Sequence, residues 1–221
     1  MIEIMRRGTS GEKSCIPVEY QQVEYLGFDI AGPYIDTGYM PSINNFYEIT
    51  IDFQTNVQIS SNYDFRPLLG FNVSYPRFIS LVVYNDVDTK KLYTAISSGD
   101  ISALKMHIAI TPFDKYRWRV VYDPSNNNVT STIEEKTSSG QLNTPNSVPN
   151  LNWVIFRGMG NNFNYHRQIS YLSINENGTP IREFIPCYRK ADNKPGMYDI
   201  VNNVFYTNAG TGEFTVGPDV N

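Results

Sequence analysis

The feature that most constrains how this chain can fold is a period-two alternation of apolar and polar side chains. In residues 46–54, "FYEITIDFQ", every second side chain is a tyrosine, isoleucine or phenylalanine, and the side chains between them are mostly acidic or hydroxylated. Residues 116–123, "YRWRVVYD", repeat the pattern with tyrosine, tryptophan and valine on one side. Such alternation is typical of a β-strand with one buried face. Similar runs predict further strands at 77–84, 91–97, 106–110, 151–157 and 168–174.

Turn-forming residues separate these runs, and no stretch has the pattern of a helix. Segments such as "NDVD" (85–88) and "DPSNNN" (123–128) favour turns, and no window of eleven or more residues keeps a helical apolar period with caps. The 221 residues, 41% of them hydrophobic, suffice for one large domain with its own core. Many short strands without helical crossovers predict an all-β fold of two packed antiparallel sheets or a barrel. Residues 136–150, rich in Ser, Thr, Asn and Pro, are expected to form a surface loop.

The first 17 residues differ from the rest and are expected to form a flexible N-terminal segment. They are mostly polar or small and end at Pro17. Such a segment can become ordered against a partner and act as an anchor, or it can remain a solvated leader, and both alternatives stay open. Residues 18–221 are expected to form the sandwich.

The N-terminal segment also bears on location. It lacks the apolar run of a secretory signal, and no stretch of 18 or more apolar residues occurs that could span a membrane. We therefore expect a virion location, because release of an assembled particle needs no signal. A bacterial cell surface or the cytoplasm is the alternative.

Residues 196–208, "GMYDIVNNVFYTN", predict a closing hairpin. Two short apolar runs flank Asn202 and Asn203, which tolerate the positive φ angles of a two-residue turn. Beyond them the chain turns through Gly210 and Gly212 and brings Phe214 back to an apolar face. A ligand-binding loop is the alternative, and the turn chemistry favours the hairpin.

Three segments together resemble a known family. They are "VEYLGFDIAGPYIDTGYMP" (23–41), "QISYLSINENGTPIREFIPCYR" (168–189) and "GMYDIVNNVFYTNAGTGEFTVG" (196–217). In this order they are similar to the concanavalin A-like (laminin G-like) lectin and glucanase family, in the branch seen in bacteriophage structural and bacterial surface proteins. The resemblance covers nearly the whole chain and implies a two-sheet antiparallel jelly-roll sandwich that the last segment closes. One departure, "GFDIAG" at 27–32, replaces a Ser-Thr-Gly-rich turn and alters only a loop.

That family includes glycoside hydrolases, whose activity depends on a catalytic pair of carboxylates. Such enzymes use two carboxylates that lie about 5.5 Å or roughly 6.5–9.5 Å apart. In hydrolytic relatives these come from an acidic Glu-x-Asp-x-Glu strand, and the nearest match here is Glu48, Thr50 and Asp52. Thr50 replaces the central acid, and a rise of ~3.3 Å per residue separates the Glu48 and Asp52 Cα atoms by about 13 Å. Adjacent Glu134 and Glu135 point to opposite faces of a strand, so we expect no enzymatic activity.

Charge and residue spacing argue against nucleic acid and zinc. The net charge is −4, and Lys and Arg form no stripe. His107 and His166 lack the spacing of zinc ligands. Cys15 and Cys187 are far apart in sequence, and two free thiols are favoured over a bridge between them.

We expect no cofactor, and a bound calcium ion is the alternative. Asp86 with Asp88, or Asp123 with Asn126 and Asn127, present the oxygen atoms that calcium prefers. Asp and Asn also cluster in turns for backbone reasons, so we expect no metal.

A sugar site needs an exposed aromatic face and planar hydrogen-bonding side chains. The densest such group lies in "NWVIFRGMGNNFNYHR" (152–167). A core position is the favoured alternative for its tryptophan, and a turn role is the alternative for the asparagines. Arg117 and Arg119, opposite Trp118, either line a binding face or are solvated. The candidate ligand-binding residues are Trp153, Arg157, Asn161, Asn162, Tyr165 and His166.

These observations favour a non-catalytic module that binds carbohydrate, a host-surface glycan in particular, as part of a phage virion or surface assembly. It would be mounted on a virion or surface protein through its N-terminal segment, with a homo-oligomer as one arrangement. A structural decoration protein of a capsid or tail without a sugar ligand is the first alternative, and a glycoside hydrolase is the second. No nucleic acid partner and no membrane span are expected.

Overall fold

The computed structural model describes residues 16–29, 32–55, 64–72, 78–86, 88–97, 104–142, 150–157 and 167–221. Every regular element in these ranges is a β-strand, so the all-β prediction is confirmed. This part of the chain contains no helix with the length and apolar character to cross a membrane. The strands are β1 (Tyr20–Gln22), β2 (Leu26–Phe28), β3 (Ile35–Asp36), β4 (Tyr47–Thr55), β5 (Asp64–Gly70), β6 (Ser80–Asp86), β7 (Lys91–Ser97), β8 (Leu104–Ile110), β9 (Lys115–Asp123), β10 (Asn128–Ile133), β11 (Lys136–Gln141), β12 (Val154–Ile155), β13 (Arg167–Glu176), β14 (Thr179–Arg189), β15 (Lys194–Asp199), β16 (Val204–Thr207) and β17 (Thr215–Val216).

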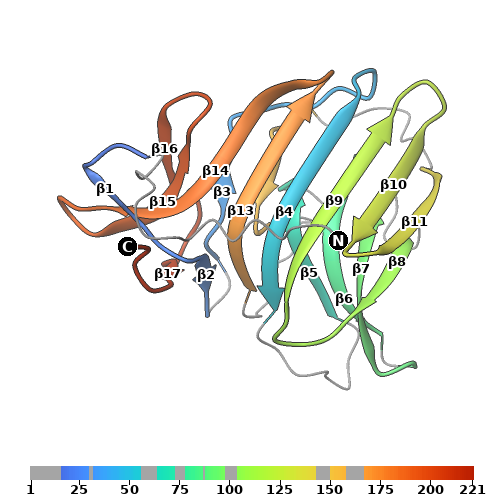
Figure 1. Ribbon diagram of the computed structural model, residues 1–221, viewed down its shortest axis with the longest axis horizontal. Coiled ribbons are helices and arrows are strands. Elements are labelled where there is room, and N and C mark those ends of the chain that lie inside the picture. The colour runs from blue at the N-terminus through green and yellow to red at the C-terminus, as the bar shows by residue number, and fades with distance from the viewer. Residues whose placement is uncertain are drawn as a thin grey trace.

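The strands form two antiparallel sheets that stack as layers (Figure 1). The larger sheet has the order β11-β10-β9-β4-β13-β14-β15-β16, and β1, β2 and β17 attach to it through β14, β13 and β2. The smaller sheet has the order β3-β12-β5-β6-β7-β8. In Figure 1, strands β5 to β8 lie behind the half of the larger sheet that contains β4 and β9 to β11. This is the two-sheet antiparallel jelly-roll sandwich that the sequence predicts.

Strand β4 explains why the sequence forms this sandwich. Its residues alternate between buried and partly exposed along the whole strand. Tyr47, Ile49, Ile51 and Phe53 face the smaller sheet and are almost completely buried. Neighbouring β9 and β13 add their own inward residues to this core. Each large apolar side chain buried in this way contributes about 1.5–3 kcal/mol.

The prediction of a loop over residues 136–150 is wrong for its first part. Residues Lys136–Gln141 form β11, the edge strand of the larger sheet, which pairs with β10. Most of its side chains are exposed on both faces, so no apolar alternation marks the strand in the sequence. The strand predicted at 151–157 is shorter than expected, because only Val154–Ile155 pair with neighbouring strands.

The closing hairpin is present, but its turn is longer than the predicted two residues. Four residues, 200–203, connect β15 and β16. The buried Asp199 carboxylate holds this turn, because Oδ1 accepts hydrogen bonds from the backbone N–H groups of Glu183 and Val201, each at 3.1 Å. Asn203 adopts the positive φ that the sequence suggests, 55°. A side-chain cap, which spacing does not reveal, therefore lengthens the turn.

The first and last described segments of the chain pair with each other. Strand β17 pairs with β2, Val23 forms a bridge with Asp219, and the Val220 N–H donates to the Gln22 carbonyl at 3.0 Å. Ile16 is also buried against the larger sheet. The packing of the sandwich therefore includes residues 16–22.

Gly196 in β15 is a position where a side chain does not fit. A Cβ atom there would lie 2.2 Å from the Tyr206 carbonyl oxygen and 2.9 Å from the Phe205 ring. Because that carbonyl belongs to the paired strand, we expect Gly196→Ala to lower the free energy of unfolding by about 3 kcal/mol. Urea unfolding followed by tryptophan fluorescence measures the loss. The control is Gly178→Ala, where the added Cβ meets open space and only the φ of 80° opposes it, a cost of about 1 kcal/mol. Equal losses in both variants would contradict the packing argument.

Candidate functional site

Trp153, the tryptophan of the predicted binding segment, lies in the core. Its side chain is 0% exposed, its ring lies nearly parallel to that of Phe78 at an angle of 8°, and its Nε1 donates to the Phe78 carbonyl at 3.3 Å. The indole therefore presents no face to a ligand, and Trp153 takes the core position that was its favoured alternative.

Arg157 is the other predicted site residue that lies within the described ranges. Its guanidinium carbon lies 4.8 Å from the centre of the Tyr34 ring, a cation–π contact. Asn161, Asn162, Tyr165 and His166 lie outside the described residues. Their grouping with Arg157 as a binding site stays a prediction.

The outward face of the larger sheet carries a different group of polar side chains, which we call the polar face. At its centre, Asp52 of β4 stands opposite Arg117 of β9 on one side and Tyr171 of β13 on the other. Arg117 donates from Nε to Asp52 Oδ1 at 2.7 Å and from Nη2 to Oδ2 at 2.6 Å. Its guanidinium carbon lies 6.0 Å from the centre of the Tyr171 ring. The polar face comprises Glu48, Thr50, Asp52, Arg117, Arg119, Tyr171, Ser173 and Glu183.

A second row of the polar face lies two residues further along the strands. The strand registers place side by side Glu183, Ser173, Thr50 and Arg119. Arg119 Nε donates to Glu48 Oε1 at 2.8 Å. The Tyr171 hydroxyl donates to Glu183 Oε1 at 3.0 Å and so connects the two rows. In this second row, the short hydroxylated side chains of Thr50 and Ser173 thus lie between longer side chains that are ion-paired or hydrogen-bonded.

Tyr171, Ser173 and Glu183 are the residues of this face that the sequence analysis missed. The register of β13 with β4 shifts between Ile169 and Tyr171, which marks a β-bulge. Counting every second residue from the buried Ile169 assigns Tyr171 to the core, whereas counting from the buried Leu172 assigns it to the outward face. The bulge makes the second count correct, and no sequence pattern announces it.

The ion pairs of the polar face also set the charge of Glu48. The hydrogen bond from Arg119 lowers the pKa of Glu48 and outweighs burial, which acts in the opposite direction. The same contact raises the pKa of Arg119, and the hydrogen bonds to Asp52 raise that of Arg117. A glycosidase general acid needs a raised pKa, so Glu48 is shifted the wrong way for that role.

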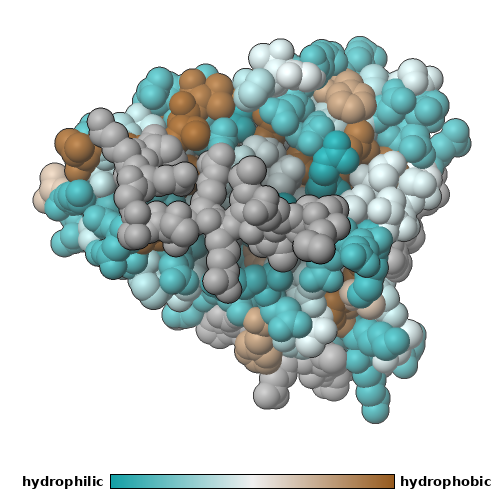
Figure 2. Space-filling model, viewed as in Figure 1, coloured by the Kyte–Doolittle hydropathy of each residue, from teal (hydrophilic) through white to brown (hydrophobic). Residues whose placement is uncertain are grey.

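Aromatic and apolar side chains border the polar face over β14, β15 and β16. The Tyr20 ring lies 5.0 Å from that of Tyr198 and 4.8 Å from that of Phe205, between ring centres. Figure 2 shows this side of the molecule, where teal and white residues dominate and one of several brown groups lies over the β15–β16 hairpin. The three aromatic rings belong to a second apolar cluster, which we call the satellite cluster. It consists of Ile16, Ile185, Cys187 and Tyr198, packed with Tyr20, Tyr171, Ile200 and Phe205.

Cys187 is a buried free thiol within the satellite cluster. Burial raises the pKa of the thiol to about 12. A thiolate nucleophile is therefore scarcely populated at neutral pH. Cys15 lies outside the described residues, so its state stays a prediction.

The aspartate oxygens that were considered as calcium ligands accept hydrogen bonds within their own turns. Asp123 Oδ1 accepts hydrogen bonds from the Ser125 N–H at 2.9 Å and from the Ser125 hydroxyl at 2.7 Å. Asp86 Oδ1 accepts one from the Asp88 N–H at 2.9 Å. Among the residues that the structure describes, no group of three or more His, Cys, Asp or Glu side chains is placed to hold a metal ion.

Comparison with known proteins bears on the fold. No family model and no curated protein matches the sequence. A protein of Bacteroides ovatus ATCC 8483, provisionally assigned as carbohydrate-binding, has a TM-score of 0.54 at 11% identity, and the match covers 90% of this chain and 62% of that one. The chain thus spans less than two thirds of that protein. This likeness confirms the predicted resemblance at the level of the jelly-roll sandwich.

Two other solved structures are similar at lower TM-scores. The heptameric SAP-like pentraxin of Limulus polyphemus has a TM-score of 0.48 at 11% identity, with 89% of each chain covered. The CBM40 domain of the Ruminococcus gnavus IT-sialidase, bound to alpha2,3-sialyllactose, has a TM-score of 0.40 at 11% identity, with 66% of this chain and 91% of that one covered.

Away from the polar face, a partly buried hydrogen-bond cluster fixes the segment "YIDTGYM" (34–40). Glu176 Oε1 accepts hydrogen bonds from the hydroxyls of Tyr39 and Tyr47 and from the Asn45 amide. Burial opposes the charge of Glu176, but the three hydrogen bonds outweigh it and lower the pKa of this carboxyl. Burial, followed by the contact with Glu176, raises the pKa of Tyr39. The cluster therefore contains a charged acceptor and neutral donors at neutral pH.

We expect Glu176→Gln to lower the free energy of unfolding by about 2 kcal/mol at pH 7, because hydrogen bonds to a charged acceptor are the stronger ones. The pKa of Glu176 is lowered from 4.5 in the folded state. Its stabilising contribution is therefore present above that value and is lost as the pH falls through the folded pKa. The stability difference between wild type and variant should shrink over the pH range below 4.5, measured by urea unfolding. The exposed Glu135→Gln is the control, and a difference for Glu176→Gln that is constant across this range would refute the assignment.

Proposed function

We propose that this chain is a non-catalytic glycan-binding module that adheres to a surface glycan as part of a phage virion or surface assembly. The observation that carries the proposal is the polar face. There, one tyrosine ring lies beside a bidentate arginine–aspartate pair, and a second ion pair and two hydroxyl groups lie in the next row.

The chemistry of the polar face suits a sugar. A sugar presents apolar C–H groups to an aromatic ring and hydroxyl groups to planar amide, carboxylate and guanidinium groups. Tyr171 supplies the ring, while the pairs Asp52–Arg117 and Glu48–Arg119 supply acceptors and donors. Because these side chains are already held by their partners, binding costs them little conformational entropy.

The fold likeness supports the same class of function. The Bacteroides ovatus protein with the same sandwich is provisionally assigned as carbohydrate-binding. At 11% identity this likeness concerns the fold, and one fold hosts many functions. The case for a sugar ligand therefore depends on the side chains of the polar face.

We assign no catalysis to the module. The carboxyl of Glu48 has a lowered pKa and accepts a hydrogen bond from Arg119, and Asp52 is engaged by Arg117 on both oxygens. These pairings support a binding role for the two acids. The placement in a virion or surface assembly rests on the sequence resemblance, with residues 1–17 as the proposed mount.

The test is a glycan array that carries bacterial surface polysaccharides, probed with the full chain and with Arg117→Ala and Tyr171→Ala. We expect binding to at least one glycan and a loss of affinity of about tenfold or more in each variant. The matched control is Arg189→Ala. Arg189 also makes a bidentate pair, with Asp192, and lies 5.8 Å from the Phe205 ring centre, but it is outside the polar face.

Three results would decide against the proposal. Equal loss of affinity in Arg117→Ala and Arg189→Ala would show that the polar face is not the site. No binding to any glycan would favour the structural decoration protein. Release of reducing sugar from a bound glycan, abolished by Glu48→Gln, would establish a hydrolase.

A further inference from the structure

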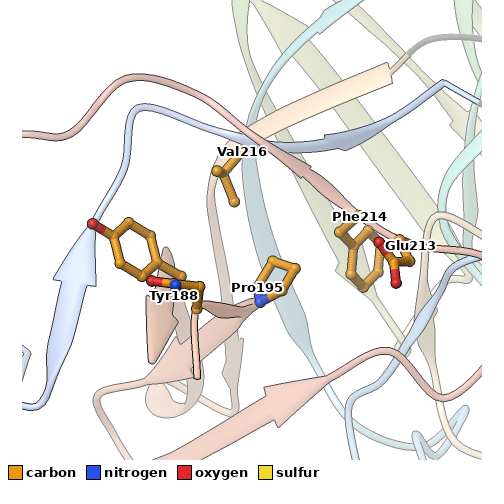
Figure 3. Close-up of a pocket in the computed structure, with 6 residues that line it drawn as sticks. Tyr188, Pro195, Glu213, Phe214 and Val216 are labelled. Carbon is orange, nitrogen blue, oxygen red and sulfur yellow. The ribbon is translucent and has the colours of Figure 1, made fainter. Parts of the chain in front are cut away.

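A pocket of about 270 Å³ opens where residues 213–216 cross the ends of β14 and β15 (Figure 3). In Figure 3, Tyr188, Pro195 and Val216 surround a common space, and Phe214 and Glu213 lie on its other side. The lining residues are Tyr188, Asn193, Pro195, Glu213, Phe214 and Val216.

The strand register explains how the apolar walls arise. Tyr188 of β14 pairs directly with Pro195 of β15, so both side chains lie on the same face of the larger sheet. Cys187, one residue earlier, points into the satellite cluster on the opposite face, where Tyr171 also lies. The pocket and the polar face therefore use opposite faces of the larger sheet and share no residue.

Backbone pairing also holds the wall that Val216 forms. Val216 pairs with Leu26 in β2, and the Gly217 N–H donates to the Tyr25 carbonyl at 2.9 Å. Phe214 closes the inner end and is part of the main core. Because Tyr188, Pro195 and Val216 lie on paired strands, these walls are in place before a ligand arrives, and they lose little conformational entropy on binding.

The lining combines apolar rings with planar polar groups. The rings of Tyr188 and Pro195 and the exposed Val216 side chain offer apolar surface to the C–H groups of a pyranose. The amide of Asn193 and the carboxylate of Glu213 can exchange hydrogen bonds with its hydroxyl groups. Two acids are close by, since Glu213 is in the lining and Asp219 accepts a hydrogen bond from the Tyr188 hydroxyl at 3.4 Å. Their negative charge disfavours an anionic sugar.

We propose that this pocket is a second carbohydrate-binding site, which takes one neutral pyranose unit and rejects anionic sugars. The site extends the module from one glycan-binding face to two. It does not depend on the polar face, because the two are built from different residues on opposite faces of the sheet.

The test uses saturation-transfer NMR with the full chain and four probes: the methyl glycosides of glucose, galactose and mannose, and glucuronic acid as the anionic counterpart. Val216→Phe fills the pocket without removing any contact of the core, and Tyr188→Ala removes one wall. The matched control is Val204→Phe, because Val204 is 41% exposed in strand β16, much like Val216 at 38% in β17. We expect a neutral glycoside to bind, with affinity at least about fivefold weaker in Val216→Phe and Tyr188→Ala and unchanged in Val204→Phe.

Each other outcome overturns the pocket proposal. These outcomes are no binding of any neutral glycoside, binding that Val216→Phe leaves unchanged, or glucuronic acid binding as tightly as the neutral sugars. Arg117→Ala separates the two proposals. If it abolishes glycoside binding while Val216→Phe does not, the pocket proposal fails and the polar face stands. Loss in Val216→Phe alone, with array binding unaffected by Arg117→Ala, would support the pocket and remove the polar face.

Discussion

The alternation of side chains in strand β4 is the constraint on which the rest of the structure depends. β4 lies at the centre of the larger sheet, and its inward residues pack against the smaller sheet. A slip of one residue against β9 or β13 would bring acids into the core and isoleucines to the surface, so burial fixes the register of all three strands. Once the register is fixed, Asp52 must face Arg117 and Tyr171. The geometry of the polar face is therefore determined by the apolar contacts on the other side of the same strands.

The two sheets are also connected by a buried charge. Arg167, at the start of β13 in the larger sheet, is almost completely buried and donates a hydrogen bond to the carbonyl of Pro67 in β5 of the smaller sheet. Its guanidinium carbon lies 5.0 Å from the centre of the Phe28 ring. A guanidinium in such a place is costly unless its donors are used. The contact thus ties the position of β13 to that of β5 in a way that apolar packing alone does not specify.

Local patterns in the sequence were sufficient for the fold class and for most strands, because burial on one face leaves a period-two signal. They failed where that signal is absent or interrupted. Strand β11 has no buried face, and the turn after β15 is set by a capping carboxylate at Asp199. The candidate sites were harder to predict, because they depend on contacts between segments far apart in the chain. The spacing of residues could indicate Arg117 as an outward-facing residue but could not show that it pairs with Asp52, 65 residues away. No pattern in the sequence indicates the bulge that turns Tyr171 outward.

The pairing of the first and last described segments has a mechanical consequence. The contacts run in sequence from Val220 with Gln22, through Asp219 with Val23, to β17 with β2, and the two segments are antiparallel. A force that pulls the two segments apart from this side therefore loads their hydrogen bonds one after another. The bond between Val220 and Gln22 is the first to bear the load. A force between the first described residues and a ligand held on the polar face instead loads the pairing of β1 with β14. The direction of pull thus decides how strongly the fold resists tension.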